Sequence, residues 1–264
     1  MTDSAGLGLG LADCRSIWVF IEVSMKRLAL LTVFVFALGL AARAEAGPLT
    51  LDATNGSNLS AQVIFDVVGG TNLQVTLTNT SLFGAVVPAD ILTAVFFDLT
   101  GVGTLTPLSA VVAPGSILND DPATNVGGEW AYSSGIGGKT PEGQNYGIGS
   151  SGLNIFGQAN FNGPNLDGPT AVAGMSYGIV SGLAANSNPT VSGMPLISDS
   201  VIFMLSGLPV GFNPSSVTIR NVYFQYGTSL SEPHLRVPEP ATVLLLVPAV
   251  IAVMAGGVRA RRKR

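Results

Sequence analysis

The residues of this sequence that could do chemistry are few, and their spacing matches no familiar catalytic pattern. The chain holds one cysteine, Cys14, and one histidine, His234. Residues 47–236 contain no cysteine, so a Cys–His nucleophilic pair is excluded there. A Ser–His–Asp site would have to use His234, which lacks a nucleophile-elbow context and precedes the C-terminal tail. The sequence predicts that His234 is a solvated linker residue and that the chain has no catalytic residue.

Paired carboxylates are the next candidates, because two acidic side chains at a suitable separation can hydrolyse a glycosidic bond. The nominal pairs are Asp120 with Asp121 and Glu129 with Glu142. Adjacent aspartates before Pro122 more often form an Asx turn than an active site. A hydrolase that depends on Glu129 or Asp120 is therefore kept as a minor hypothesis, and we expect the protein not to be an enzyme.

The same segment could supply oxygen ligands to a hard cation such as calcium. Asn119, Asp120, Asp121 and Asn125 lie close together in the sequence, but their spacing matches no EF-hand loop. Zinc is less plausible still, since the body has neither thiolates nor a histidine cluster to hold it. We therefore expect no metal site and no cofactor.

Aromatic side chains lie among many glycines between residues 118 and 169, a stretch that predicts long loops over one end or face of the body. These side chains are Trp130, Tyr132, Tyr146 and Phe156. Exposed rings on loops can stack on sugar rings, which makes a carbohydrate-binding module an alternative function, with Trp130 and Tyr132 as contacts. The favoured interpretation is that the four rings pin the loops onto the core.

The elements that position these residues are predicted to be β-strands. Short runs rich in Val, Ile, Thr and Phe, bounded by Gly, Pro, Asn or Asp, cover residues 62–68, 73–78, 91–99, 200–205 and 216–224. In the second run, Leu73, Val75 and Leu77 alternate with polar residues, which gives one buried face and one wet face. Several strands without alternating helices favour an all-β fold, a single β-sandwich of jelly-roll or immunoglobulin-like form, over a β-helix.

The body of the chain, residues 47–236, is acidic. It carries three Lys or Arg residues against eleven Asp or Glu residues, a net charge of −8. Such a surface repels nucleic acid and anionic lipid, so neither is expected to bind the body.

Residues 25–46 have the three-part pattern of a secretory signal peptide. A short basic start is followed by an uncharged apolar run and then by small residues. Ala44 and Ala46 fit the small pockets of a signal peptidase, so we expect cleavage after Ala46 and a mature chain that starts at Gly47. Residues 1–24 include acidic residues, which indicates either a start codon assigned too early or an extended n-region.

Residues 241–258 are apolar and uncharged, and they predict a transmembrane helix. A helix of 18 residues is about 27 Å long, close to the hydrocarbon thickness of a bilayer. The basic tail that follows, residues 259–264, contains Arg259, Arg261, Arg262, Lys263 and Arg264. Clustered Lys and Arg stay on the cytoplasmic side, which leaves the body outside.

The residues directly before this span are Val237-Pro238-Glu239-Pro240. Their placement before a single span with an Arg-rich end resembles the PEP-CTERM sorting signal of Gram-negative bacteria, which occupies residues 237–264 here. The resemblance implies that Pro238, Glu239 and Pro240 are recognised by a membrane protease of the exosortase type. The two prolines hold the backbone extended and remove amide donors, which suits entry into a protease cleft.

A weaker resemblance to exosortase-dependent surface proteins runs from about residue 150 to the C-terminus, for example at residues 222–228. Together these features predict an exported bacterial surface or extracellular-matrix protein with a structural or adhesive role. Its expected partners are signal peptidase, exosortase and the membrane, with extracellular polysaccharide as a further candidate. The inner membrane would hold the chain until processing. Besides the carbohydrate-binding module, a plain membrane-anchored periplasmic protein remains an alternative.

Overall fold

The computed structural model describes residues 47–238, apart from residues 57, 120–121, 158–159, 167–173, 183–193 and 216. The predicted signal peptide with Ala44 and Ala46, the span, the basic tail, Glu239 and Pro240 lie outside these described residues. Within the described residues, none of the helices has the length and apolarity needed to cross a membrane. The described residues form thirteen β-strands and one short 3₁₀ helix, η1 (Pro88–Asp90), so the predicted all-β class is confirmed.

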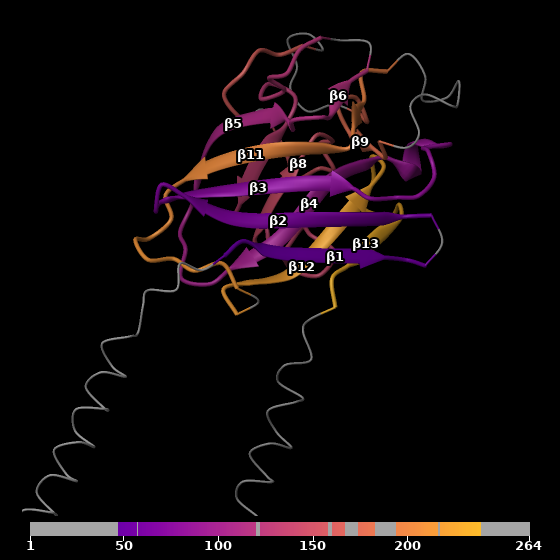
Figure 1. The fold of residues 1–264 in the computed structure, drawn as a ribbon. Helices are drawn as coiled ribbons and strands as arrows, with labels where there is room; N and C mark the ends of the chain where they lie inside the picture. The colour runs from indigo at the N-terminus through magenta and orange to yellow at the C-terminus, as the bar shows by residue number, and fades with distance from the viewer. Residues whose placement is uncertain are drawn as a thin grey trace, which may run out of the picture. The chain divides into compact units, whose positions relative to one another are not determined.

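The first sheet has five strands in the order β1-β2-β3-β11-β5, and all its neighbours are antiparallel (Figure 1). Its strands are β1 (Leu49–Thr54), β2 (Ser60–Val68), β3 (Asn72–Asn79), β5 (Thr106–Val112) and β11 (Ser200–Ser206). Three of the predicted runs correspond to β2, β3 and β11, whereas β1 and β5 were not predicted.

The second sheet has eight strands, with the main order β13-β12-β4-β9-β10-β6. These are β4 (Leu92–Leu99), β6 (Ile117–Leu118), β9 (Ile179–Val180), β10 (Ile197–Ser198), β12 (Ile219–Tyr226) and β13 (His234–Arg236). A branch of the sheet contains β8 (Tyr146–Gly149), which pairs with both β4 and β7 (Ala131–Ser134). The predicted runs at 91–99 and 216–224 correspond to β4 and β12.

Alternation of apolar and polar residues explains why the strands form. In β3, Leu73, Val75 and Leu77 are fully buried, and the polar residues between them are partly exposed. Because successive side chains of a strand point to opposite faces, this strand presents one face to the core and one to solvent. The predicted faces of this strand are confirmed.

The facing sides of the two sheets share one core. Phe65 of β2 and Phe97 of β4 meet edge to face, with ring centroids 5.1 Å apart. Trp130 packs against Phe203 of β11 at 4.9 Å. Since all four rings are fully buried, this aromatic layer joins the sheets and contributes much of the burial energy.

The other face of the second sheet is covered as well. Phe96 of β4 stacks on Phe156 with centroids 5.8 Å apart, and both rings are buried. Gly147 and Gly149 of β8 allow this approach, because a Cβ at Gly147 would lie 2.7 Å from the Phe96 ring. The expectation that residues 118–169 form long loops holds for most of the described residues there, but it missed β7 and β8, where Gly147 and Gly149 allow close packing.

The strand directions place both ends of the described chain away from the Asn79 end of the first sheet. β1 runs in the same direction as β3, so Gly47 lies at the end of the first sheet opposite Asn79. The Asn79 side-chain amide donates to the Ile179 carbonyl at 2.9 Å, and Ile179 pairs with Leu92 at the start of β4. β13 runs in the same direction as β4 and therefore leads Pro238 away from that end.

Candidate functional site

The residue directly before the Pro-Glu-Pro motif is still held by the second sheet. The amide of Val237 donates to the Val222 carbonyl at 3.0 Å, and the Val237 side chain is buried in the core. Pro238, the next residue, is exposed. The predicted sorting motif thus begins inside the folded body, with no linker between the last strand and the first proline.

β13, which leads into the motif, is a short edge strand. It pairs in antiparallel fashion with β12 through three residues, and Arg236 lies opposite Tyr223. Leu235 points into the core and is buried, whereas His234 and Arg236 are exposed. Apolar burial of Leu235 and Val237 on one face therefore holds the strand against the body.

The turn between β12 and β13 is bound by two side chains. The Gln225 amide is fully buried and donates to the carbonyls of Tyr226 and Ser229 at 2.7 and 2.9 Å, with longer bonds further along the turn. The Glu232 carboxylate accepts from the amides of Thr228 and Ser229 at 2.5 and 2.7 Å. These bonds satisfy several backbone groups of the turn and so help to set the register of β13 on β12.

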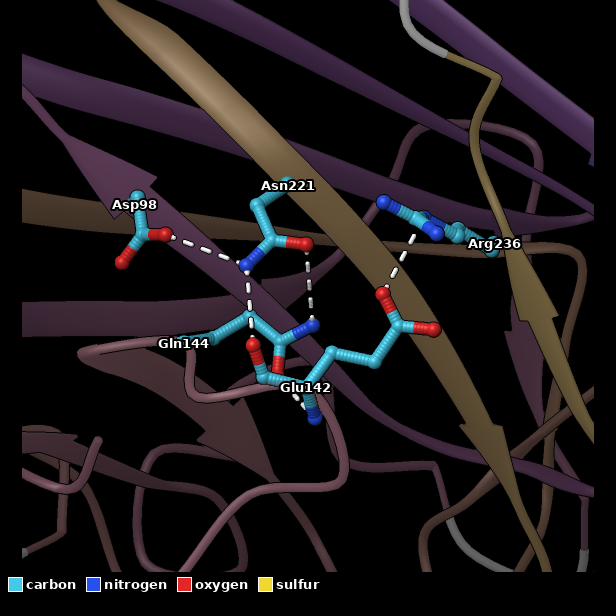
Figure 2. Close-up of polar contacts among 5 residues, drawn as sticks. All are labelled: Asp98, Glu142, Gln144, Asn221 and Arg236. Carbon is cyan, nitrogen blue, oxygen red and sulfur yellow. Dashed lines mark hydrogen bonds and ion pairs between the residues drawn. The ribbon is translucent and has the colours of Figure 1, made fainter. Parts of the chain in front are cut away.

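A network of five polar side chains, which we call the polar cluster, connects β13 with the rest of the sheet (Figure 2). Its members are Asp98, Glu142, Gln144, Asn221 and Arg236. The Asn221 amide donates to the Asp98 carboxylate at 3.2 Å and to the Glu142 carbonyl at 3.3 Å, and the Gln144 amide donates to the Asn221 side-chain oxygen at 3.5 Å. The Arg236 Nε lies 3.1 Å from the Glu142 carboxylate.

A β-bulge places Asn221 at the centre of the polar cluster. The pairing of β12 with β4 shifts between Arg220 and Tyr223, and Asn221 has a φ of 53°, in the left-handed region. Asparagine tolerates this conformation better than most residues. The bulge turns the Asn221 side chain toward Asp98 and Glu142, as bulges beside functional sites often do.

Tyr223 lies beside the polar cluster and supports His234. The two rings stack with centroids 4.8 Å apart, and Tyr223 is buried. Burial, together with the nearby Glu142 carboxylate, raises the pKa of Tyr223 to about 12. Its hydroxyl has no hydrogen-bond partner among the described residues. His234 is exposed, as predicted, but the prediction that it lies in a linker was wrong, because it belongs to β13 and stacks on Tyr223.

The four aromatic residues of the glycine-rich stretch are all buried, with Trp130 fully enclosed and its indole NH donating to the Tyr177 carbonyl at 3.1 Å. The Tyr132 hydroxyl accepts from the Leu105 amide, and the Tyr146 hydroxyl donates to the Val102 carbonyl at 2.6 Å. The favoured prediction that these rings are packed into the core is confirmed, but only Trp130 and Phe156 come from loops, since Tyr132 and Tyr146 belong to β7 and β8. Sugar stacking on Trp130 and Tyr132 is contradicted, because neither face of a buried ring is available.

The nominal catalytic carboxylates do not come together in a described site. Glu129 is buried and accepts a hydrogen bond from the Leu166 amide, and Glu142 pairs with Arg236. Asp120 and Asp121 lie outside the described residues. Glu129 and Glu142 therefore each have a structural partner, and these contacts explain their positions without a catalytic role.

The proposed calcium ligands are only partly described. Asn119 is buried, and Asn125 uses its side-chain oxygen to accept from the Gly127 amide at 3.0 Å. In the part of the chain that the structure describes, His, Cys, Asp and Glu form no group of three that could hold a metal ion.

The sequence pattern did not reveal the polar cluster. Asp98, Gln144 and Asn221 come from three separate segments, and no spacing rule relates them. One signal was present: Arg220 and Asn221 interrupt an apolar run, and polar residues inside a strand can mark a bulge.

Comparison with protein-family models, curated proteins and solved structures gave no match to this chain.

Proposed function

We propose that this chain is an exported bacterial surface or extracellular-matrix protein that an exosortase processes at its C-terminal PEP motif. The observation that supports this most directly is the position of the motif. Val237 is buried, and Pro238, the last residue that the structure describes, is exposed. The strands of the described residues all end by Arg236, so cleavage within the motif would leave both described sheets intact.

The other end of the body also suits this proposal. β1 begins at Leu49, two residues after the predicted mature start at Gly47, so signal-peptide removal leaves the first strand complete. Gly47 lies opposite the Asn79 end of the first sheet and β13 leads Pro238 away from that end, so a C-terminal anchor would hold the body away from the Asn79 end. The Asn79 end, which exposed Leu82 and Phe83 follow in the sequence, would then point away from the membrane.

We propose further that the body is a single β-sandwich, of jelly-roll or immunoglobulin-like form, with a structural or adhesive role. Two antiparallel-rich sheets that share an aromatic core support the sandwich. A non-enzymatic role is supported by the nominal catalytic residues, since Glu129, Glu142 and His234 each contribute to packing or pairing. The net charge of −8 over residues 47–236 argues against nucleic acid as a partner on electrostatic grounds.

The test is the intact mass of the protein, with mapping of both terminal peptides, from its host with and without the exosortase gene. The proposal expects a chain that starts at Gly47 and has lost the basic tail only when the enzyme is present. Retention of Arg264 in both strains would contradict processing and would instead support a plain membrane-anchored protein.

A pair of variants sharpens this test. Replacing Glu239→Gln removes the one charge of the motif and is expected to block or slow tail removal. Asp66→Asn, on β2 of the first sheet, makes the same kind of change away from the motif and should leave processing unchanged. Equal processing of both variants would show that Glu239 is not recognised.

A further inference from the structure

Residues 234–237, which we call the C-terminal clasp, bind the end of the body to β12. Two side chains of the clasp lie in the core, Leu235 at 4% and Val237 at 7% exposure. Two others make surface contacts, His234 on the Tyr223 ring and Arg236 with the Glu142 carboxylate. The clasp is therefore held by few contacts compared with the central strands.

The clasp can open without unfolding the sheet. β13 is three residues long and, among the described strands, pairs with β12 alone, whereas β12 keeps β4 on its other side. Short edge strands belong to the low-stability regions of a protein, which open locally far more often than the whole molecule unfolds. Release of residues 234–237 would leave the pairing of β12 with β4 in place.

The closed clasp withholds part of the motif from a protease. Proteases that accept an extended peptide contact backbone groups and side chains on both sides of the recognised residues. While the clasp is closed, the Val237 amide is bonded to the Val222 carbonyl and the Val237 side chain is buried. The first free residue is Pro238, which has no amide hydrogen to donate.

We infer that the C-terminal clasp controls processing: the closed state hides Val237 and the residues before it, and the open state presents the complete motif to the enzyme. This inference rests on the proposed function. It assigns a regulatory part to Leu235, Arg236 and Glu142, which lie outside the Pro-Glu-Pro sequence itself. The processing rate would then follow the fraction of molecules with an open clasp.

Amide hydrogen exchange on the full chain, recovered in detergent micelles from a strain without exosortase, tests whether the clasp opens. The Val237 amide is expected to exchange at least about tenfold faster than the Val95 amide of β4, which lies between two paired strands. Equal exchange at Val237 and Val95 would mean that the clasp opens only on global unfolding, and it would overturn the inference.

Two variants test whether opening sets the processing rate. Leu235→Ala removes a core contact of the clasp and should speed both Val237 exchange and processing by at least about tenfold. Leu108→Ala, on the partly exposed surface of β5, is the matched control and should change neither. Glu142→Gln is a second variant that leaves the core unchanged. It removes the carboxylate that pairs with Arg236, and we expect a twofold to fivefold increase in the rates of Val237 exchange and of processing. Asp66→Asn is its control.

The outcomes separate the inference from the proposed function. A wild-type chain that keeps its tail in both strains contradicts the proposed function, and the inference falls with it. Normal wild-type processing that is no faster in Leu235→Ala and Glu142→Gln, although Val237 exchange has increased, contradicts the clasp alone. Parallel increases in exchange and processing support both.

Discussion

The Arg236 Nε lies 3.1 Å from the Glu142 carboxylate, so the last strand before the Pro-Glu-Pro motif is paired with the segment between β7 and β8. The two side chains are 55% and 34% exposed. Solvent screens an ion pair of this exposure, and such pairs contribute about 0–1 kcal/mol. We therefore assign the main stability of β13 to Leu235 and Val237, and a smaller part to the ion pair.

This assignment predicts the result of a double-mutant cycle with Glu142→Gln and Arg236→Gln. The coupling free energy should not exceed about 1 kcal/mol and should decrease in high salt, because both groups face water. Denaturant unfolding at two salt concentrations measures it. A coupling of several kcal/mol that salt does not change would show that the pair is buried.

Trp130 is predicted to be a core residue in solution. It is the only tryptophan of residues 47–236, so its fluorescence reports on this site alone, and we expect a blue-shifted emission that acrylamide quenches poorly. Trp130→Ala should lower the free energy of unfolding by about 3–5 kcal/mol because it leaves a large cavity. The control Leu82→Ala, at a side chain that is 72% exposed, should change it by less than about 0.5 kcal/mol.

Gly147 is predicted to tolerate no side chain. A Cβ there would lie 2.7 Å from the Phe96 ring and 3.0 Å from the Phe156 ring, so Gly147→Ala should cost about 1–3 kcal/mol through overpacking. Gly103→Ala is the control, since a Cβ at Gly103 would meet nothing within 4 Å. Thermal unfolding followed by circular dichroism compares the two, and equal melting temperatures would disprove the close packing.

Asn221 stabilises the bulge through its left-handed backbone conformation and through its side-chain hydrogen bonds, and two substitutions can separate these contributions. Asn221→Gly keeps the left-handed backbone but loses the hydrogen bonds to Asp98 and Glu142, at a cost of about 0.5–1.5 kcal/mol. Asn221→Ala loses the bonds and also strains the backbone, so we expect it to be less stable than the glycine variant by about 1 kcal/mol. Unfolding in urea measures both. An alanine variant as stable as the glycine variant would show that φ at this position is not left-handed.

Alkaline pH should destabilise the protein partly through Tyr223. Its pKa is about 12 in the folded state and about 10 in the unfolded state, so above about pH 10 the unfolded state loses its proton first. Stability from this group is fully present below about pH 10 and is lost as the pH rises toward 12. Burial raises the pKa of Tyr226 as well, so this residue also contributes to the loss of folding stability at alkaline pH.

Tyr223→Phe tests this dependence. At pH 7 the variant should be as stable as the wild type or slightly more stable, because the buried hydroxyl that it removes has no partner among the described residues. Between pH 10 and 12 it should lose less stability than the wild type, by about 1–3 kcal/mol. Identical pH profiles would contradict the raised pKa.

The strands that could be predicted are those with a strong local pattern. β2, β3, β4, β11 and β12 combine β-branched or aromatic residues with clear boundaries, and all five were predicted. β5 was missed because Pro107 lies within it, and proline is tolerated there only because β5 is the edge of its sheet. β8 was missed because two of its four residues are glycines, which usually indicate a loop.

The candidate site was harder to predict than the strands. The sequence motif at residues 237–240 is contiguous and could be found directly, as could the acidic charge of the body. The polar cluster could not be found, since its members lie on β4, on β12, on β13 and in the segment between β7 and β8. No local rule states that these segments are neighbours.

The sequence by itself determined the all-β class and the faces of its regular strands, because alternation along one strand decides which side chains are buried. Only the tertiary structure decided that Trp130 and Tyr132 are closed to ligands, that His234 stacks on Tyr223, and that Val237 is held by the sheet. The physical reason is that each of these outcomes depends on sheet order and register, which long-range pairing sets. Alternation within a strand depends on neighbouring residues alone, whereas the strand that β13 pairs with depends on contacts between distant parts of the sequence.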